Sequence, residues 1–506
     1  MIRLAALFLG PFLLLVTALA PAPGSLTEAS WRVAGLAGWM AAWWLTAVVP
    51  LEATALLPIV VLPLAGVAPV GDVTVRYADP IIFLFLGGFL LAATLERWDL
   101  HRRFALAAVR GIGTDAPRVV LAFMLASAVA SMWISNTATT LMMLPIAGAV
   151  IAGRTSGGLK AGGATLARMP ISTDRPTSRS GVVPSGGGAE AEGGFPTALM
   201  LGVAYGASIG GVATLIGTPP NAILAGAASD LVGREISFSS WLALGFPVAI
   251  PMLAGCWLLL IRLFRVRGTV AGLAQSVDRE HRRMGTMSGA ERFVLLVFAL
   301  TALAWIFRLP KSIGAARIPG LADLWPGISD PAIAIGAALV LFVVPLPGAR
   351  FPTALDWESA KKIPWGILLL FGGGLALASA FESSGLTEWL GGRLEALHGA
   401  PMIVVLFATS ALFVMLTELT SNTATAALGM PLMVGVAQGV GMEALPLMVA
   451  AALAASMAFM LPVATPPNAI VFGSGAISSA DMAKAGIGLN LLAMIVITLV
   501  VSLLGV

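Results

Sequence analysis

Apolar stretches long enough to cross a lipid bilayer recur along almost the whole of this 506-residue sequence. A membrane-spanning helix needs roughly 20 mostly apolar residues, and we expect about eleven such spans. With 58% apolar and only 11% charged residues, the chain carries more apolar surface than a soluble core could bury. We therefore predict an all-α polytopic membrane protein. The predicted spans lie near residues 2–20, 33–50, 52–70, 81–97, 197–229, 240–265, 290–307, 330–345, 363–382, 443–474 and 485–505.

Two further apolar stretches, 118–150 and 401–438, are predicted to be re-entrant hairpins that enter and leave on the same side of the membrane. With the N-terminus in the cytoplasm, most of the 29 Lys and Arg residues then fall in cytoplasmic loops, as the positive-inside rule requires. We predict an inner-membrane protein whose C-terminus lies outside. Because topology explains the net charge of +4, no nucleic-acid partner is expected.

The composition of the connecting segments indicates how the chain is organised. The segment 151–196, rich in Gly, Ser, Arg and Pro, is predicted to be a flexible cytoplasmic linker. The single Cys256 allows no disulfide framework. The N-terminal segment could be a cleaved signal peptide, but a retained first helix is favoured because later spans would drive insertion in any case. The predicted divisions are a first helix and loop (1–32), a first repeat (33–265), a connector (266–289) and a second repeat (290–506).

The sequence contains an internal repeat. Phe85-Leu86-Gly87-Gly88 returns as Phe371-Gly372-Gly373-Gly374, 286 residues further on. The same offset maps Ser135-Asn136-Thr137-Ala138-Thr139 onto Ser421-Asn422-Thr423-Ala424-Thr425. A third pair, Thr218-Pro219-Pro220-Asn221 and Thr465-Pro466-Pro467-Asn468, has an offset of 247, and the long linker accounts for the difference. Since an odd number of spans separates the copies, we predict two inverted repeats, the plan of many secondary transporters.

The repeated motifs combine breaks in helices with small polar side chains. Each Ser-Asn-Thr run lies midway through an apolar hairpin, and two consecutive prolines must break the spans 197–229 and 443–474. Helix N-termini at such breaks present unpaired N–H groups to an anion, while released carbonyls and hydroxyls can hold sodium. A single motif would more often be a kink or a packing patch, but four breaks in two copies favour a binding site.

Other polar residues carry weaker signals. Glu418 is an intramembrane carboxylate, for which a paired structural role is favoured over titration. Glu96 and Glu382 lie at predicted membrane edges, and the three His residues lack the spacing of metal ligands. The glycine pairs inside the apolar helices indicate close helix packing rather than phosphate binding, because no strand precedes them.

From the second span onward, the sequence resembles the divalent anion/sodium symporter family, the carriers of dicarboxylates, citrate and sulfate. The paired Ser-Asn-Thr runs carry the resemblance, together with the stretch from Ala455-Ser456 through Pro462-Val463-Ala464 to Asn468 and Ile470-Val471. The resemblance implies a homodimer in which a transport domain moves against a fixed scaffold, an elevator mechanism. It also implies sodium as the coupling ion, with no organic cofactor and no enzymatic activity.

The resemblance implies the site residues as well. The residues implied to contact the substrate are Ser135, Asn136, Thr137, Ser421, Asn422, Thr423, Thr465 and Pro466. The first implied sodium site consists of Ser131, Ser135, Asn136 and Gly217, and the second of Thr417, Ser421, Asn422 and Ala464. The expected function is sodium-coupled symport of a small divalent oxyanion, with C4-dicarboxylates such as succinate favoured over citrate or sulfate. A sodium-independent exchanger or oxyanion exporter is the alternative, and a membrane-embedded enzyme using Glu418 is a remote one.

Overall fold

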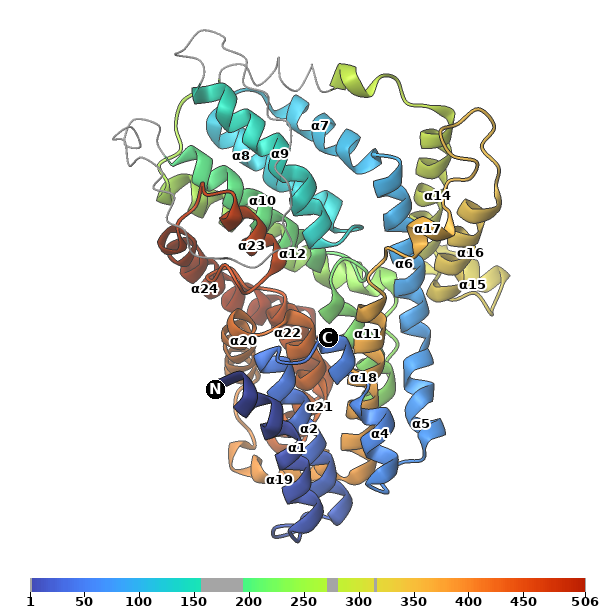
Figure 1. Cartoon of the computed structure of the whole chain (residues 1–506), viewed down its shortest axis with the longest axis vertical. Coiled ribbons are helices and arrows are strands. Elements are labelled where there is room, and N and C mark those ends of the chain that lie inside the picture. The colour runs from blue at the N-terminus through green and yellow to red at the C-terminus, as the bar shows by residue number, and fades with distance from the viewer. Residues whose placement is uncertain (1, 156–193, 271–280, 314–315, 506) are drawn as a thin grey trace.

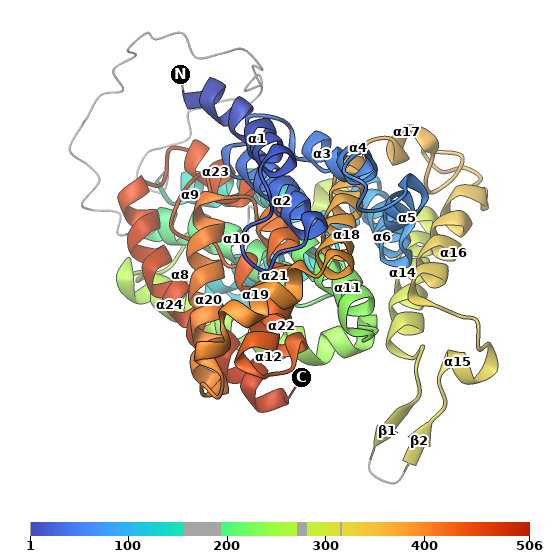
Figure 2. The same ribbon diagram turned by 90° about the horizontal axis from the view of Figure 1, so that it is seen from below.

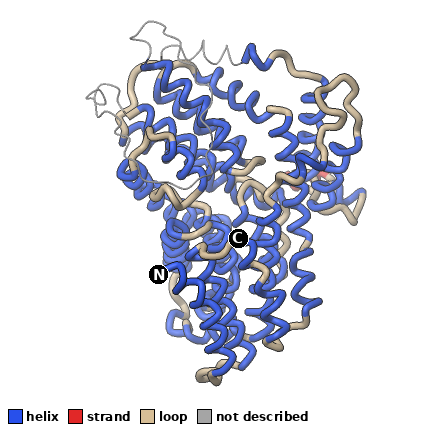
Figure 3. Tube along the Cα trace, in the orientation of Figure 1, coloured by secondary structure: helices blue, strands red, loops and turns tan. Residues whose placement is uncertain are grey.

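The computed structural model describes residues 2–155, 194–270, 281–313 and 316–505, and most of them are helical (Figures 1 and 3). The helices of the first half are α1 (Ile2–Leu19), α2 (Glu28–Thr46), α3 (Leu51–Thr54), α4 (Leu57–Leu64), α5 (Val70–Val75), α6 (Pro80–Arg97), α7 (Leu100–Ile112), α8 (Ala116–Ser131), α9 (Asn136–Thr155), α10 (Phe195–Val212), α11 (Pro219–Val232) and α12 (Phe238–Leu263). Those of the second half are α14 (Gly289–Ile306), α15 (Leu321–Leu324), α16 (Asp330–Val343), α17 (Trp357–Ala360), α18 (Trp365–Ser384), α19 (Leu386–Arg393), α20 (Met402–Leu419), α21 (Asn422–Val440), α22 (Ala444–Ala455), α23 (Pro466–Gly473) and α24 (Ser479–Leu504).

The helices have the lengths and composition of a polytopic membrane protein, as predicted. In the part of the chain that the structure describes, eight are long and apolar enough to cross a membrane. Several predicted spans are shorter or interrupted. The window 52–70 contains the short helices α3 and α4, and the window 330–345 holds the 14-residue α16. Pro58, in the first turn of α4, accounts for the first interruption, because it has no N–H to donate to the carbonyl four residues before it.

Some elements were not anticipated, and part of the predicted linker cannot be assessed. Residues 156–193, most of the linker 151–196, lie outside the described residues. The α7 helix was missed because Arg102 and Arg103 interrupt its apolar pattern. A small antiparallel hairpin, β1 (Lys311–Ile313) and β2 (Ala316–Ile318), projects from the molecule between α14 and α15 (Figure 2).

Equivalent residues of the two copies touch at α6 and α18. The rings of Phe85 and Phe371, which occupy the same position in the repeat, lie 5.2 Å apart between centroids in an edge-to-face arrangement. A residue can contact its own equivalent only where the axis relating the copies passes close to both. The pair therefore supports a two-fold relation between the repeats.

The remaining helices correspond in the same way. The pair α8–α9 matches α20–α21, and α10–α11 matches α22–α23. The 26-residue helices α12 and α24 are matched too, since Ser237 and Ser478 each cap them by accepting the N–H three residues ahead. Moreover, α9 packs against α23 while α21 packs against α11, so the contacts of one copy are exchanged in the other (Figures 1 and 2).

Close approach explains the glycine motifs in α6 and α18. A Cβ atom added at Gly87 would lie 2.5 Å from the Cβ of Ala334 on α16. One added at Gly373 would lie 2.3 Å from the carbonyl oxygen of Ala55, just after α3. The predicted packing role of these glycines is confirmed, because any side chain would separate the helices.

Burial separates the helices into an enclosed set and a peripheral set. Within α10, 89% of the residues are buried inside the protein, whereas in α14 the figure is 33%. The outward side chains of α14 are therefore available to lipid, and those of α10 to other helices. The broken helices thus lie inside the molecule, where irregular backbone can be tolerated.

Candidate substrate and sodium site

The first Ser-Asn-Thr run forms the turn between α8 and α9, which we call the first tip (residues 131–139). Ser131, the last residue of α8, is fully buried, and its hydroxyl donates to Oδ1 of Asn136 over 2.5 Å. The Ser135 hydroxyl accepts a hydrogen bond of 3.2 Å from the backbone N–H of Ala138. Two of the oxygens implied for the first sodium site are therefore in direct contact.

The second Ser-Asn-Thr run forms the turn between α20 and α21, which we call the second tip (residues 417–425). Thr417 is fully buried and donates over 2.7 Å to Oδ1 of Asn422. The same hydroxyl lies 2.7 Å from the carbonyl oxygen of Ala455 at the end of α22. The second tip thus repeats the hydroxyl-to-carboxamide contact of the first at the same position in the repeat.

The Asn of each Thr-Pro-Pro-Asn motif ties together the two sides of a helix break. In the first copy, Nδ2 of Asn221 donates to the carbonyls of Gly211 and Thr214, over 3.2 and 2.7 Å. In the second copy, Nδ2 of Asn468 donates to the carbonyls of Ala458 and Leu461, over 3.2 and 3.1 Å. The four carbonyls correspond pairwise at the offset of 247. The sequence analysis quoted both asparagines but gave them no role.

Gly217 is brought close to Asn136 through Gly211. A Cβ atom added at Gly211 would lie 2.6 Å from Oδ1 of Asn136 and 3.2 Å from the carbonyl oxygen of Gly217. Two members of the first implied sodium site, Asn136 and Gly217, therefore lie against one glycine, and a third, Ser131, is hydrogen-bonded to Asn136; all three offer oxygen. Oxygen donors of this kind suit a hard cation such as sodium. The spacing also requires glycine at position 211.

Glu418 holds the second break rather than lining a catalytic site. Its carboxylate is 4% exposed and accepts hydrogen bonds from the backbone N–H groups of Phe459, Met460 and Leu461, over 2.7 to 3.0 Å. Nδ2 of Asn490 on α24 donates to the same group over 2.8 Å. Successive N–H groups of this kind form an anion-binding nest. The favoured structural role of Glu418 agrees with these four donors.

The predicted substrate residues differ in burial. Ser135 and Pro466 are exposed, and Asn136, Thr137, Ser421, Asn422 and Thr423 are half-buried. Thr465 is buried, and its hydroxyl accepts the N–H of Asn468 as the N-cap of α23. Ala464 precedes it in the same break.

A cavity of about 320 Å³ adjoins the first tip. It is lined by Ala138 and Thr139 on α9 together with Glu96, Asp99 and His101. Burial lowers the pKa of His101, although a hydrogen bond with the Leu95 carbonyl opposes the shift. The histidine is therefore neutral near pH 7 and does not offset the two carboxylates.

The chemistry of the two tips is suited to ions of both signs. The first N–H groups of α9 and α21 have no preceding turn to bond with, and they carry the positive end of the helix dipole. An oxyanion can be held there without Arg or Lys. The Asn carboxamide oxygens and the carbonyls released at the breaks are neutral oxygen donors, which suit a hard cation. Each tip can therefore bind an anion and a cation next to each other.

Comparison with known proteins gives matches over the whole chain. The family model described as the sodium:sulfate symporter transmembrane region matches residues 2–506. The sodium-dependent dicarboxylate transporter SdcS of Staphylococcus saprophyticus is 39% identical over 508 residues, covering 99% of this chain and 91% of that protein. SdcS of Staphylococcus aureus is 39% identical over 509 residues, with coverages of 99% and 90%. The solved structure of the Alcanivorax borkumensis YdaH transporter is similar at 14% identity and a TM-score of 0.49, covering 99% of this chain and 98% of that one.

Proposed function

This chain belongs to the sodium:sulfate symporter family, and from that premise we propose that it couples inward sodium movement to uptake of a C4-dicarboxylate such as succinate. The SdcS proteins, which are named sodium-dependent dicarboxylate transporters, support this substrate over citrate and sulfate. The lipid bilayer is the solvent of the protein, and sodium is a transported ion rather than a resident cofactor.

The duplicated contact between a buried hydroxyl and a motif asparagine is the observation that carries the proposal. Ser131 with Asn136, and Thr417 with Asn422, place two neutral oxygens side by side in each tip. A sodium ion that binds between them contacts both oxygens, and the hydroxyl keeps its proton and turns it away from the ion. The substrate residues are Ser135, Asn136, Thr137, Ser421, Asn422, Thr423, Thr465 and Pro466.

Coupling follows from the sequence of binding. Without sodium, a buried hydroxyl donates to the Oδ1 atom of each tip asparagine, and we expect this hydrogen bond to order the tip less firmly than a bound ion does. Sodium orders each tip and adds positive charge next to the anion, so the dianion binds the sodium-loaded form more tightly. A ligand can shift a conformational equilibrium only through such a difference in affinity. Movement of the tips as one transport domain, and assembly as a homodimer, are part of the proposal.

Uptake by the purified protein in liposomes tests the proposal. We expect an inward sodium gradient to drive accumulation of labelled succinate, and an equal potassium gradient to drive none. Citrate and sulfate serve as competitors that rank the substrates. Accumulation that requires internal succinate and ignores sodium would instead identify an exchanger, and no uptake of any of the three anions would refute the transport proposal.

A further inference from the structure

The cavity of about 320 Å³ beside the first tip contains side-chain oxygens that belong to neither implied sodium site. We call it the tip cavity. Its carboxylates belong to Glu96, in the last turn of α6, and to Asp99, the residue before α7. Its hydroxyl belongs to Thr139, one turn into α9. The rest of its lining consists of His101, Ile134, Ala138, Leu141 and Met142.

The Thr139 hydroxyl is buried without a hydrogen-bond partner. The residue is 1% exposed, and its Oγ1 atom makes no hydrogen bond to any residue that the structure describes. The next residue, Thr140, shows the usual arrangement of a helical threonine, since its hydroxyl donates back to the carbonyl of Asn136 over 2.8 Å. Because an unpaired buried hydroxyl destabilises a fold, this oxygen indicates a ligand in the cavity that it lines.

The two carboxylates of the tip cavity are not paired with cations of the protein. Glu96 and Asp99 take part in none of the ion pairs between described residues. Although Asp99 is the N-cap residue of α7, its side chain accepts no capping hydrogen bond. His101 is neutral near pH 7, since burial lowers its pKa. The oxygens of both carboxylates are therefore available to a ligand.

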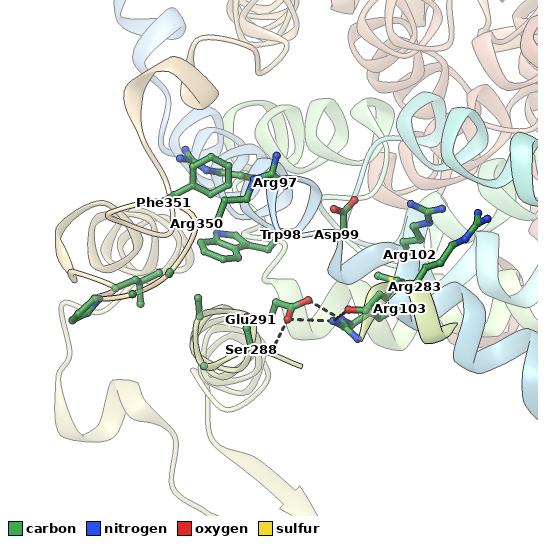
Figure 4. A pocket seen from close by; sticks show the side chains of 17 residues that line it. Arg97, Trp98, Asp99, Arg102, Arg103, Arg283, Ser288, Glu291, Arg350 and Phe351 are labelled. Carbon is green, nitrogen blue, oxygen red and sulfur yellow. Dashed lines mark hydrogen bonds and ion pairs between the residues drawn. The ribbon is translucent and has the colours of Figure 1, made fainter. Parts of the chain in front are cut away.

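A neighbouring arginine-rich pocket shares Asp99 with the tip cavity (Figure 4). No hydrogen bond or ion pair joins Asp99 to the arginines drawn in Figure 4. Arg97 pairs instead with Asp356 at 2.6 Å. Arg103 pairs with Glu291 at 2.7 Å. The nearby arginines therefore leave the carboxylate of Asp99 unoccupied.

The internal repeat shows how the threonine is arranged where no cavity adjoins it. At the offset of 286, Thr139 corresponds to Thr425, whose hydroxyl is hydrogen-bonded to the hydroxyl of Thr420. The counterpart of Thr420 in the first copy is Ile134, which lines the tip cavity and has no polar side-chain atom. In the first copy, a cavity thus lies where the second copy has the partner of the hydroxyl.

Asp99 is a second difference between the copies. Its counterpart is Gly385, and both residues have left-handed backbone conformations, with φ of +51° at Asp99 and +81° at Gly385. Glycine adopts this conformation without strain, whereas a residue with a Cβ does not. The first copy therefore keeps a carboxylate at a position where glycine would be more stable. Glu96 matches Glu382, so the second copy has one of the two acidic groups and lacks the free hydroxyl.

We propose that the tip cavity binds a sodium ion through the carboxylates of Glu96 and Asp99 and the hydroxyl of Thr139. Carboxylate and hydroxyl oxygens are hard ligands that suit such a cation. Both carboxylates are exposed, so the ion enters from solution, and waters complete its coordination. Once bound, it joins the turn between α6 and α7 to α9, the helix that begins in the first tip. The choice of sodium rests on the proposed function, whereas the cation site rests on these oxygens alone.

A thiol placed in the tip cavity reports on the ion locally. Leu141 lines the cavity and is 54% exposed, while the natural Cys256 is fully buried, so Leu141→Cys supplies the reactive thiol. Its rate of reaction with a maleimide is measured on the purified protein in sodium, potassium or choline chloride, without succinate. We expect sodium to slow the reaction and the other two salts not to. The sodium concentration that gives half of this protection measures the affinity of the site.

Asp99→Gly and Glu382→Gln, each added to Leu141→Cys, form the decisive pair. Asp99→Gly gives the first copy the residue of the second and relieves backbone strain, so in choline chloride it should melt no lower than its parent. It should nevertheless raise the half-protecting sodium concentration about tenfold, because one full charge near the cation is lost at a partly solvated site. Glu382→Gln removes the matched acidic group of the second copy and should leave that concentration unchanged.

A second pair separates the ligand role of Thr139 from a structural one. Thr139→Val removes a hydroxyl that bonds to no described residue, so it should weaken protection by sodium without lowering the melting temperature in choline chloride. Thr425→Val breaks the hydrogen bond with Thr420 and should melt lower, with protection by sodium retained. If Thr139→Val protects as its parent does, the hydroxyl is not a ligand and the proposed site is wrong.

The remaining outcomes are equally decisive. Protection by sodium that Asp99→Gly weakens and Glu382→Gln retains supports the proposal. Labelling that ignores sodium, or the same sodium dependence with and without Asp99→Gly, overturns it. Protection by calcium or magnesium in place of sodium would assign the site to a divalent cation and refute the sodium assignment. The melting temperatures of the wild type and Asp99→Gly in sodium and in choline chloride repeat the comparison without an introduced thiol. Because succinate is absent, a failure here leaves the transport proposal standing, and sodium-independent uptake in liposomes would refute only the latter.

Discussion

The two helix breaks have the same internal bonds but different surroundings. In both, an asparagine amide binds a pair of carbonyls, Asn221 in the first break and Asn468 in the second. The first break, residues 211–218, is buried throughout. In the second, Val463 is 84% exposed, whereas its counterpart Ile216 is 7% exposed. The hydrogen bonds of the breaks are therefore duplicated, but the exposure of the breaks is not.

The two breaks differ in exposure because two positions carry different residues in the two copies of the repeat. Trp133 of the first tip packs edge-on to Phe298 at 4.7 Å and stacks on Phe238 at 5.9 Å, whereas its counterpart Leu419 is 73% exposed. The backbone carbonyl of Met132 accepts a hydrogen bond from the Thr214 hydroxyl. The counterpart of Met132 in the second copy is Glu418, whose carboxylate accepts hydrogen bonds from three backbone N–H groups. An aromatic cluster closes the first break, and a carboxylate holds the second in an extended form.

The largest effect is expected where the copies are most alike. Asn136→Ala and Asn422→Ala each remove an oxygen that serves both ions, so each should abolish sodium-driven uptake while folding is retained. The measurement is succinate uptake in liposomes, with melting temperature as the control. A wild-type uptake rate in either variant would show that the asparagine of that tip is not required for transport.

The next largest effect concerns the residue that distinguishes the breaks. Glu418→Met gives the second copy the residue of the first and leaves three backbone N–H groups and the Asn490 amide without their acceptor. We expect a loss of about 4 kcal/mol in stability, roughly 1 kcal/mol per lost partner, seen as a lower melting temperature in detergent. Met132→Leu, the matched change in the first copy, should melt close to the wild type. Equal melting of the two variants would contradict the anchoring role of Glu418.

The break asparagines allow the two sodium sites to be examined separately. Asn221→Ala frees carbonyls beside Gly217, and Asn468→Ala frees those beside Ala464. Each should raise the sodium concentration for half-maximal uptake about thirtyfold, since two hydrogen bonds of about 1 kcal/mol each are lost. The readout is the sodium dependence of uptake at saturating succinate. A fall in stability with unchanged sodium dependence would make both asparagines purely structural.

The smallest effect concerns access. Cys256 is the single cysteine and is fully buried, so thiol reagents report on introduced cysteines. Val463→Cys should react readily and Ile216→Cys slowly. Adding Trp133→Leu should speed labelling of Ile216→Cys about fivefold, because an aromatic contact contributes about 1 kcal/mol. Leu419→Met is the control, and an unchanged rate with Trp133→Leu would mean that the aromatic cluster does not close the first break.

The tips and breaks could be predicted from the internal repeat, because a motif that occurs twice at a fixed offset is unlikely to arise by chance. The hydroxyl-to-carboxamide contacts follow from it directly: Ser131 and Thr417 lie one helical turn before the motif serines. The predicted assignment of ligands to sodium and substrate is not tested by these contacts and stays a prediction.

What escaped prediction depends on partners far away in the chain. Glu418 meets residues 459–461 and Asn490, and Trp133 meets Phe238 and Phe298, and no spacing in the sequence relates these segments. These residues differ between the copies, so the repeat could not reveal them either. The α7 helix was missed because it is amphipathic, and a search for continuous apolar windows does not detect such helices.

The contact between Phe85 and Phe371 has a consequence for movement. In a carrier of this plan, the two copies exchange conformations when the site moves from one side of the membrane to the other. Every contact away from the two-fold axis that relates the copies is then replaced by the equivalent contact in the other copy. A contact between equivalent residues is its own counterpart, so it is the same before and after the exchange. The two phenylalanines are therefore placed to act as a pivot, a point that the whole cycle leaves in place.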